Sequence, residues 1–179
     1  DRRPVIKAAI DGAGAVTTYN QSHAIRLRIL FPEVTSKVTV LPKGVTLGTE
    51  PFDPGIDGFL FFHPGGIRPV KNNLFAVDGV ESLGTAAHLL VAGPVLDEKY
   101  GAQFQERISS LQRVHYRERI PHEAMGSAYA RADVVLNTSL SEGLSNALIE
   151  AMVVGRPILA SDVPGNRDLI ESGKTGILY

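Results

Sequence analysis

A single carboxylate, Glu150, interrupts the apolar run from Ala147 to Val154. The run predicts a helix that is apolar on most sides, so Glu150 is expected to be buried. A buried carboxylate without hydrogen-bond donors is costly, and this one therefore needs partners. The candidates are Asn146, which lies one helical turn earlier, an arginine from elsewhere in the chain, or the hydroxyl groups of a bound ribose or sugar.

A second carboxylate, Glu142, lies eight positions before Glu150, just ahead of the same predicted helix. If this segment were helical throughout, ~12 Å would separate the two residues along the axis, on the order of the distance between sugar and ribose in a nucleotide-diphosphate sugar. Between them lie the N–H groups around Leu144, Ser145 and Asn146, which are free in the first helical turn and favour phosphate. The order of acid, amides and acid thus matches sugar hydroxyls, diphosphate and ribose hydroxyls.

A second candidate anion site lies in the stretch "FLFFHPGGIRPVKNN". Gly65 and Gly66 follow a predicted strand, Arg68 and Lys71 follow the glycines, and Asn72 lies near a predicted helix start. Backbone N–H groups, a helix dipole and two cations are therefore expected to converge. The glycine spacing is neither that of a Walker A loop nor G-x-G-x-x-G, so a tight turn with two solvated cations remains the alternative.

Other side chains give weaker signals. The five histidines are scattered, and only His63, at a strand end beside the basic pair, is a candidate for the site. Asp168 is expected to cap its helix. We find no D-x-D pair or paired histidine cluster, so no metal site is expected, and the lack of cysteine excludes disulfides and thiolate chemistry.

Composition narrows the class of protein. The 179 residues include 18 Lys plus Arg and 19 Asp plus Glu, so no overall positive charge points to nucleic acid or anionic lipid. No stretch approaches the ~20 apolar residues of a spanning helix, and the first residues lack the layout of a signal peptide. We therefore expect a cytoplasmic protein with no nucleic-acid partner.

The order of apolar runs predicts the fold. From residue 59 onward, strand-like runs alternate with helical patterns of roughly 10 to 15 residues, which is typical of a parallel sheet covered on both faces. We predict an α/β fold with a doubly wound, Rossmann-like sheet in three αβα layers. The stretch 45–58 is rich in glycine and proline and is predicted to be a linker. Strands are expected near 59–63, 88–93, 113–116, 133–139, 156–161 and 176–179, with helices near 71–83, 97–111, 122–131, 145–154 and 166–172.

These motifs together resemble a known family. The spacing of Glu142 and Glu150 in "SEGLSNALIEAM", followed by "GRPILASDVPGNRDLIESGKTGILY", is similar to the donor-binding domain of retaining glycosyltransferases of the GT-B fold, family-4 type. The resemblance extends through "RADVVLNTSLSEG", "RIPHEAMGSAYARAD" and "IRPVKN". The last of these is especially similar to proteins described as glycosyltransferase 1 domain-containing.

The resemblance implies a role for each acidic and basic residue. Arg68 and Lys71 match the pair that neutralises the diphosphate and the charge on the leaving nucleotide, a form of electrostatic catalysis. Glu142 matches the catalytic Glu near the donor sugar hydroxyls, and Glu150 matches the ribose-binding Glu. Many relatives separate the Arg and Lys by four residues, whereas two residues separate them here.

The resemblance also implies backbone contacts with the donor. Gly143, Leu144, Ser145 and Asn146 match the turn whose amides face sugar and phosphate. Gly66 belongs to the phosphate corner. The base is expected near Arg119 and Ile120, in the loop after the third strand.

The domain organisation follows from the same resemblance. Residues 1–52 are expected to be the closing segment of an N-terminal acceptor domain plus the hinge, and residues 53–179 the donor domain, with both ends truncated. A metal-independent transfer with retention of configuration is implied, without a cofactor. The acceptor stays open between a sugar, a lipid and a small molecule, as does contact with a membrane surface through the N-terminal domain.

The implied activity has alternatives. On its own the chain is expected to bind a nucleotide sugar weakly and to transfer nothing. A nucleotide-sugar epimerase or a phosphorylase of the same fold, or a non-catalytic nucleotide-binding scaffold, are the alternatives. A phosphorylase would need a lysine for pyridoxal phosphate or a free-phosphate site, and Lys71 is the nearest candidate for that lysine.

Overall fold

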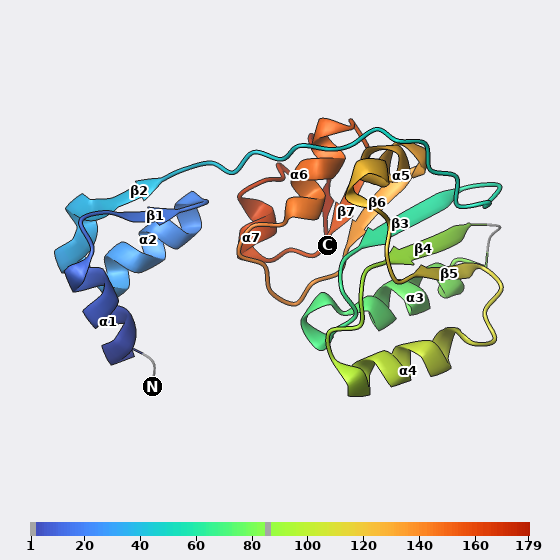
Figure 1. The fold of residues 1–179 in the computed structure, drawn as a ribbon, viewed down its shortest axis with the longest axis horizontal. Helices are drawn as coiled ribbons and strands as arrows, with labels where there is room; N and C mark the ends of the chain where they lie inside the picture. The colour runs from blue at the N-terminus through green and yellow to red at the C-terminus, as the bar shows by residue number, and fades with distance from the viewer. Residues whose placement is uncertain (1–2, 85–86) are drawn as a thin grey trace. The chain divides into compact units, whose positions relative to one another are not determined.

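The computed structural model describes residues 3–84 and 87–179, which form two compact units, Asp1–Gly44 and Val45–Tyr179 (Figure 1). The boundary between the units falls at residue 44, whereas the sequence placed it at residue 52. The origin of the first unit as the end of an acceptor domain stays a prediction. Within the described residues, no helix has the length and apolar character that crossing a membrane requires.

The first unit is small and has its own core. Its side chains Ile10, Ala24, Phe31, Val34 and Val38 are buried together. Two short parallel strands pair in it, and its N-terminal helix was not predicted from the sequence. The elements are α1 (Arg3–Gly12), β1 (Val16–Thr18), α2 (Gln21–Leu30), the 3₁₀ helix η1 (Pro32–Lys37) and β2 (Val38–Val40).

The second unit is built on a six-stranded parallel sheet with the strand order β5-β4-β3-β6-β7-β8. This order confirms the predicted doubly wound fold. The direction of winding reverses between β3 and β6, and ligands of such sheets bind beyond the carboxyl ends of the strands at this reversal. The strands are β3 (Leu60–Pro64), β4 (His88–Ala92), β5 (Val114–Arg117), β6 (Val134–Asn137), β7 (Ile158–Ala160) and β8 (Ile177–Leu178).

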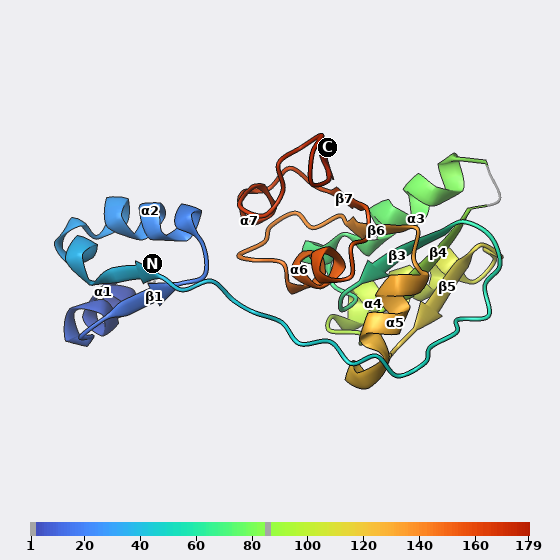
Figure 2. The same cartoon turned by 90° about the horizontal axis from the view of Figure 1, so that it is seen from above.

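Helices cover both faces of this sheet, as Figure 2 shows from above. The helices α3 (Asn73–Ser82) and α4 (Glu98–Ile108) cover one face, while α5 (Met125–Arg131) and α6 (Asn146–Val153) cover the other. The remaining helical segments are η2 (Pro69–Lys71), η3 (His122–Ala124) and α7 (Pro164–Arg167).

Alternation along the strands divides the core into two layers. Leu89 and Val91 of β4 pack under α3 and α4, whereas Leu90 packs with Phe62 under α5 and α6. The rings of Phe62 and Tyr129 meet edge to face with 5.2 Å between centroids. Tyr129 is thereby anchored in the core at the phenyl end of its side chain.

Two helices differ from the sequence predictions. The helix α6 is apolar in sequence but is not buried on most sides, because only Leu148 and Ala151 within it are buried and Val153 is 64% exposed. The helix α7 begins at Pro164 and is much shorter than predicted. Asp168 lies at the C-terminal end of α7, as its C-cap, and not at the helix start, where a carboxylate would be favoured.

The predicted linker has no helix or strand, but it packs against the second unit. The Glu50 N–H donates to the Glu123 carbonyl at 2.7 Å, and the Gly126 N–H donates to the Gly48 carbonyl at 3.0 Å. Ile56 is buried in the core under α5 and α6. The segment is therefore an ordered part of the second unit rather than a free connection.

Substitution of Gly48 tests this packing. A Cβ at Gly48 would lie 2.3 Å from the Cα of Glu123, whereas a Cβ at Gly44 would meet nothing within 4 Å. We expect Gly48→Ala to lower the free energy of unfolding by about 1–3 kcal/mol, as overpacking does. Gly44→Ala is the matched control and should change it by less than ~0.5 kcal/mol. Urea unfolding followed by circular dichroism measures both, and equal effects would contradict the packing.

Candidate functional site

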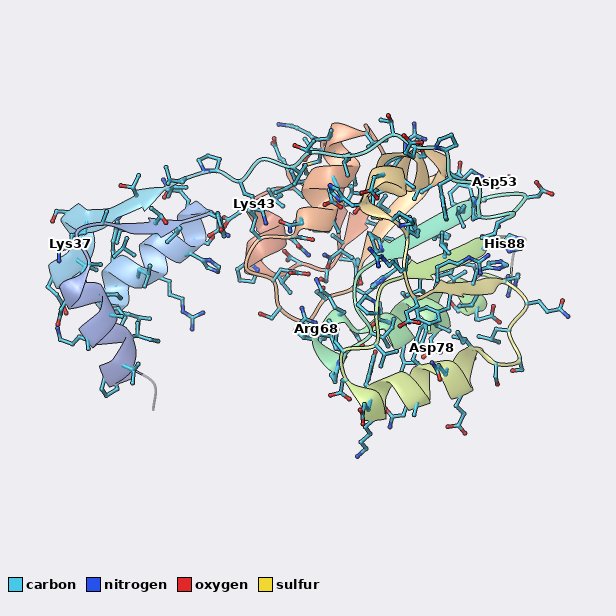
Figure 3. All side chains as sticks on the ribbon, in the orientation of Figure 1. Lys37, Lys43, Asp53, Arg68, Asp78 and His88 are labelled. Carbon is cyan, nitrogen blue, oxygen red and sulfur yellow. The ribbon has the colours of Figure 1, made fainter. Side chains whose placement is uncertain are left out.

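The loops that follow β3 and β6 meet at the winding reversal. The first loop carries Arg68, which is exposed and which Figure 3 labels, and Lys71. The second carries Glu142 and leads into α6. Both predicted corners therefore belong to one site.

A cleft of 400 Å³ lies between these loops. It brings together Arg68, Lys71, Glu142 and Glu150 with the start of α6, as the sequence predicted. A second, apolar groove beside α3 has no charged side chain among its lining residues, so it does not suit a diphosphate. The cleft is lined by Pro64, Gly65, Arg68, Lys71, Ala92, Met125, Tyr129, Glu142, Leu144, Ser145, Asn146, Ala147 and Glu150.

Lys71 and Glu142 form an ion pair with 2.6 Å between Nζ and Oε1. The same oxygen also accepts from the Ser139 hydroxyl at 2.6 Å and from the Asn137 side-chain amide at 3.2 Å. Burial raises the pKa of Glu142, but the hydrogen bonds from Lys71, Ser139 and Asn137 outweigh it and hold the pKa below the ordinary value. Glu142 therefore stays ionised, with three donors on one of its two oxygens.

Asn137 joins this carboxylate to the start of α6. Its buried side-chain amide donates to the Ser145 hydroxyl at 2.9 Å as well as to Glu142. Its Oδ1 accepts from the Ser139 N–H at 3.0 Å. Sequence reasoning missed Asn137 and Ser139, although the polar letters "NTS" at the end of an apolar strand were the available signal.

Glu150 is held by Tyr129. The Tyr129 hydroxyl donates to Oε2 of Glu150 at 2.6 Å, and burial, followed by the Glu150 charge, raises the pKa of Tyr129. The donor among the described residues is thus neither Asn146 nor an arginine, and Glu150 is half-buried at the cleft rather than sealed in the core. Tyr129 was also missed, because nothing in the sequence pairs it with Glu150.

The turn before α6 is not helical. The helix begins at Asn146, and its first backbone bond runs from the Ile149 N–H to the Ser145 carbonyl at 3.2 Å. The ~12 Å estimate for a continuous helix therefore does not apply to Glu142. Leu144, Ser145 and Asn146 are among the residues that line the cleft, and the N–H groups at the start of α6 precede the first helical bond. Their contact with a phosphate stays a prediction.

The two glycines after β3 have different roles. Gly65 lines the cleft and has a φ of 151°, which favours glycine. Gly66 does not line the cleft, and a Cβ there would lie 2.5 Å from the Leu96 side chain. Gly65 is thus the glycine that lines the cleft, and the predicted contact of Gly66 with a donor stays a prediction.

Three other predicted residues lie outside the residues that line the cleft. Ile120 is buried in the core under α5 and α6, and Arg119 is exposed in the loop after β5. Gly143 is exposed in the turn before α6. Their contacts with a base or a sugar stay predictions.

His63 lies at the end of β3 and is fully buried behind the cleft. Burial, followed by the Lys71 charge, lowers its pKa to about 4, so its ring is neutral at physiological pH. In the ranges 3–84 and 87–179, no three His, Asp or Glu side chains gather where they could hold a metal ion.

Comparison with known proteins identifies the family. The model of the glycosyl transferases group 1 family matches residues 58–179, so the chain belongs to this family, and the resemblance noted in the sequence is confirmed. Glycosyltransferase 1 domain-containing protein 1 of Xenopus tropicalis is 26% identical over 98% of this chain and 55% of its own length. The D-inositol 3-phosphate glycosyltransferase of Mycobacteroides abscessus is 27% identical over 94% of this chain and 39% of its own length.

Solved structures share the fold. The Anabaena protein Alr3699/HepE, in complex with UDP-glucose, has a TM-score of 0.83 at 20% identity, over 99% of this chain and 52% of its own. Sucrose-phosphate synthase from Thermosynechococcus elongatus has a TM-score of 0.82 at 21% identity, over 99% of this chain and 48% of its own. The fold is thus that of GT-B glycosyltransferases, and the chain spans about half the length of these relatives.

The low pKa of His63 predicts a pH dependence of stability. The pKa is 6.5 in the unfolded chain and about 4 in the folded one, so between these values the unfolded chain binds a proton that the folded chain does not. The free energy of unfolding should therefore fall as pH falls from 6.5 to 4, by about 3 kcal/mol from this residue, and His63 should add no slope above that window.

His63→Gln should reduce this fall, while the charges of Lys71 and Glu142 that face the ring remain in both proteins. Chemical unfolding at several pH values measures the difference. Equal slopes in the two proteins would contradict a buried, neutral His63.

Proposed function

We propose that the cleft binds the nucleotide-diphosphate sugar of a glycosyltransferase that transfers the sugar to an acceptor with retention of configuration. The observation that carries the proposal is the convergence of two cations, two carboxylates and the start of α6 on one cleft at the winding reversal. The relative Alr3699/HepE, which shares the fold, was solved with UDP-glucose, and this supports a nucleotide sugar as ligand.

The diphosphate is proposed to bind between Arg68, Lys71 and the first amides of α6. A diphosphate carries two or more negative charges, and a guanidinium, an ammonium and helix N–H groups are donors that suit it. During transfer the same groups would stabilise the charge that develops on the leaving nucleotide, in the manner of electrostatic catalysis.

The two carboxylates are proposed to bind hydroxyl groups at opposite ends of the donor. Within the described residues, Lys71, Ser139 and Asn137 all donate to Oε1 of Glu142, and Tyr129 donates to Oε2 of Glu150. Each carboxylate therefore keeps a second oxygen for a ligand. Glu142 would then accept from the sugar and Glu150 from the ribose. The protein-held oxygen fixes the orientation of the other in each case.

The acceptor and the transfer step are proposed to need more than this chain. The chain spans about half of its relatives, and we expect it to bind the nucleotide sugar weakly and to transfer nothing in isolation. Measurable transfer by the 179 residues alone would contradict this second expectation without touching donor binding.

Calorimetric titration tests the proposal. Wild-type protein should bind UDP or another nucleoside diphosphate, and Arg68→Met should weaken this binding about tenfold or more because a charged hydrogen-bond donor to phosphate is lost. Titration with UDP, GDP and ADP sugars identifies the donor, whereas a scaffold should bind none of them.

Arg107→Met is the matched control for Arg68→Met. Arg107 lies on α4, where it pairs with Asp78 and does not line the cleft. The control removes the same charge and should bind as the wild type does. Equal losses in the two variants, or no binding by wild type, would contradict the proposal.

A further inference from the structure

Three buried polar side chains meet behind the loop that carries Arg68 and Lys71, which we call the basic loop. They come from three different elements. They are His63 at the end of β3, Asn73 at the start of α3 and Thr138 directly after β6. Their exposed fractions are 1%, 0% and 5%, respectively. Buried polar groups of this kind are costly unless they are paired, so their arrangement calls for an explanation.

We propose that His63, Asn73 and Thr138 form a buried clamp that holds the backbone of Arg68 and Lys71, so that both cations reach one diphosphate. The inference rests on the proposed anion site and deepens it. These residues do not touch the ligand, and their role is to position the residues that do.

The partners of Asn73 show which atoms of the clamp donate hydrogen bonds and which accept them. The Arg68 N–H donates to Oδ1 of Asn73 at 3.4 Å, which turns the Asn73 amide nitrogen toward Nδ1 of His63, at 3.5 Å. Nδ1 of His63 is therefore the acceptor, and its proton lies on Nε2. The neutral ring that burial imposes agrees with this assignment.

The other half of the clamp runs to Lys71. Nε2 of His63 lies 2.9 Å from the Thr138 hydroxyl oxygen and donates to it. The Thr138 hydroxyl in turn donates to the carbonyls of Lys71 and Asn72, at 2.9 and 3.0 Å. Arg68 is thus held by its N–H and Lys71 by its carbonyl, through one chain of bonds.

The basic loop is a conformation that needs such support. The Lys71 N–H donates to the Arg68 carbonyl at 3.0 Å, which makes a compact turn of two cations separated by two residues. Asn72, at its end, has a φ of 52° and is the one described residue other than glycine with a positive φ. A left-handed residue other than glycine is strained, and this conformation persists where neighbouring groups hold it in place. The clamp supplies this constraint at Lys71 and Asn72.

The first test removes the Thr138 hydroxyl. Thr138→Val keeps the shape but removes the donor to both carbonyls, whereas Thr138→Ser keeps the donor and serves as the matched control. We expect Thr138→Val to weaken the binding of inorganic pyrophosphate and of UDP about tenfold. The affinities of Thr138→Ser should stay within about threefold of wild type. Binding of uridine, which lacks phosphate, should be equal in all three proteins.

A purely structural role would give a different pattern. Loss of stability alone would lower the melting temperature without selecting phosphate ligands. Wild-type affinity of Thr138→Val for pyrophosphate, or an equal loss for uridine and pyrophosphate, would overturn the clamp.

A second pair of variants decides the matter if Thr138→Val does not fold. His63→Gln places an amide donor near the position of Nε2, keeps the half of the clamp that reaches Lys71, and should bind pyrophosphate within about threefold of wild type. In His63→Asn the shorter amide reaches only the position of Nδ1, so this variant should bind pyrophosphate about tenfold more weakly than wild type. Equal pyrophosphate affinities in these two variants would overturn the clamp.

Wild-type ligands separate this inference from the proposed function. If the wild type binds pyrophosphate but not UDP, the nucleotide-sugar proposal fails while the clamp is still decided by the variants. If it binds neither, the anion site and the clamp fall together.

Discussion

The ion pair between Lys71 and Glu142 is the interaction on which the site depends. It joins the loop after β3 to the turn after β6, the two strands at which the winding of the sheet reverses. Partial burial makes such a pair sensitive to the loss of either partner, because the remaining charge is left without compensation. The pair therefore keeps a cation and a carboxylate from two different loops at fixed positions in one cleft.

Buried neutral side chains connect this ion pair to the start of α6 and hold the second carboxylate of the site. Asn137 links Glu142 to Ser145 at the start of α6, and Tyr129, anchored by its ring in the core, holds Glu150. Both carboxylates at the cleft are thus oriented by a neutral, buried side chain. An arrangement fixed before a ligand arrives loses less entropy on binding.

The sequence predicted the sheet, its winding and the meeting of the two corners, because strand and helix periods are local and parallel strands end at one edge. It failed where contacts between distant segments decide the structure. The glycines and prolines of the segment 45–58 suggest an unattached linker. Its backbone hydrogen bonds to η3 and α5 nevertheless make it an ordered part of the second unit. The partner of Glu150 is 21 residues away on another helix, and no spacing rule reaches it. The sequence pointed to Gly66 as the glycine of the phosphate corner, because residue types alone do not reveal the positive φ angle of Gly65.

A double-mutant cycle between Lys71 and Glu142 measures whether this ion pair holds the two loops together. The free energies of unfolding of wild type, Lys71→Met, Glu142→Gln and the double variant give the coupling between the two side chains. We expect a favourable coupling of about 1 kcal/mol or more, with the double variant more stable than the sum of the single effects implies. A coupling near zero would contradict it, because the two loops would then be held in place independently of this pair.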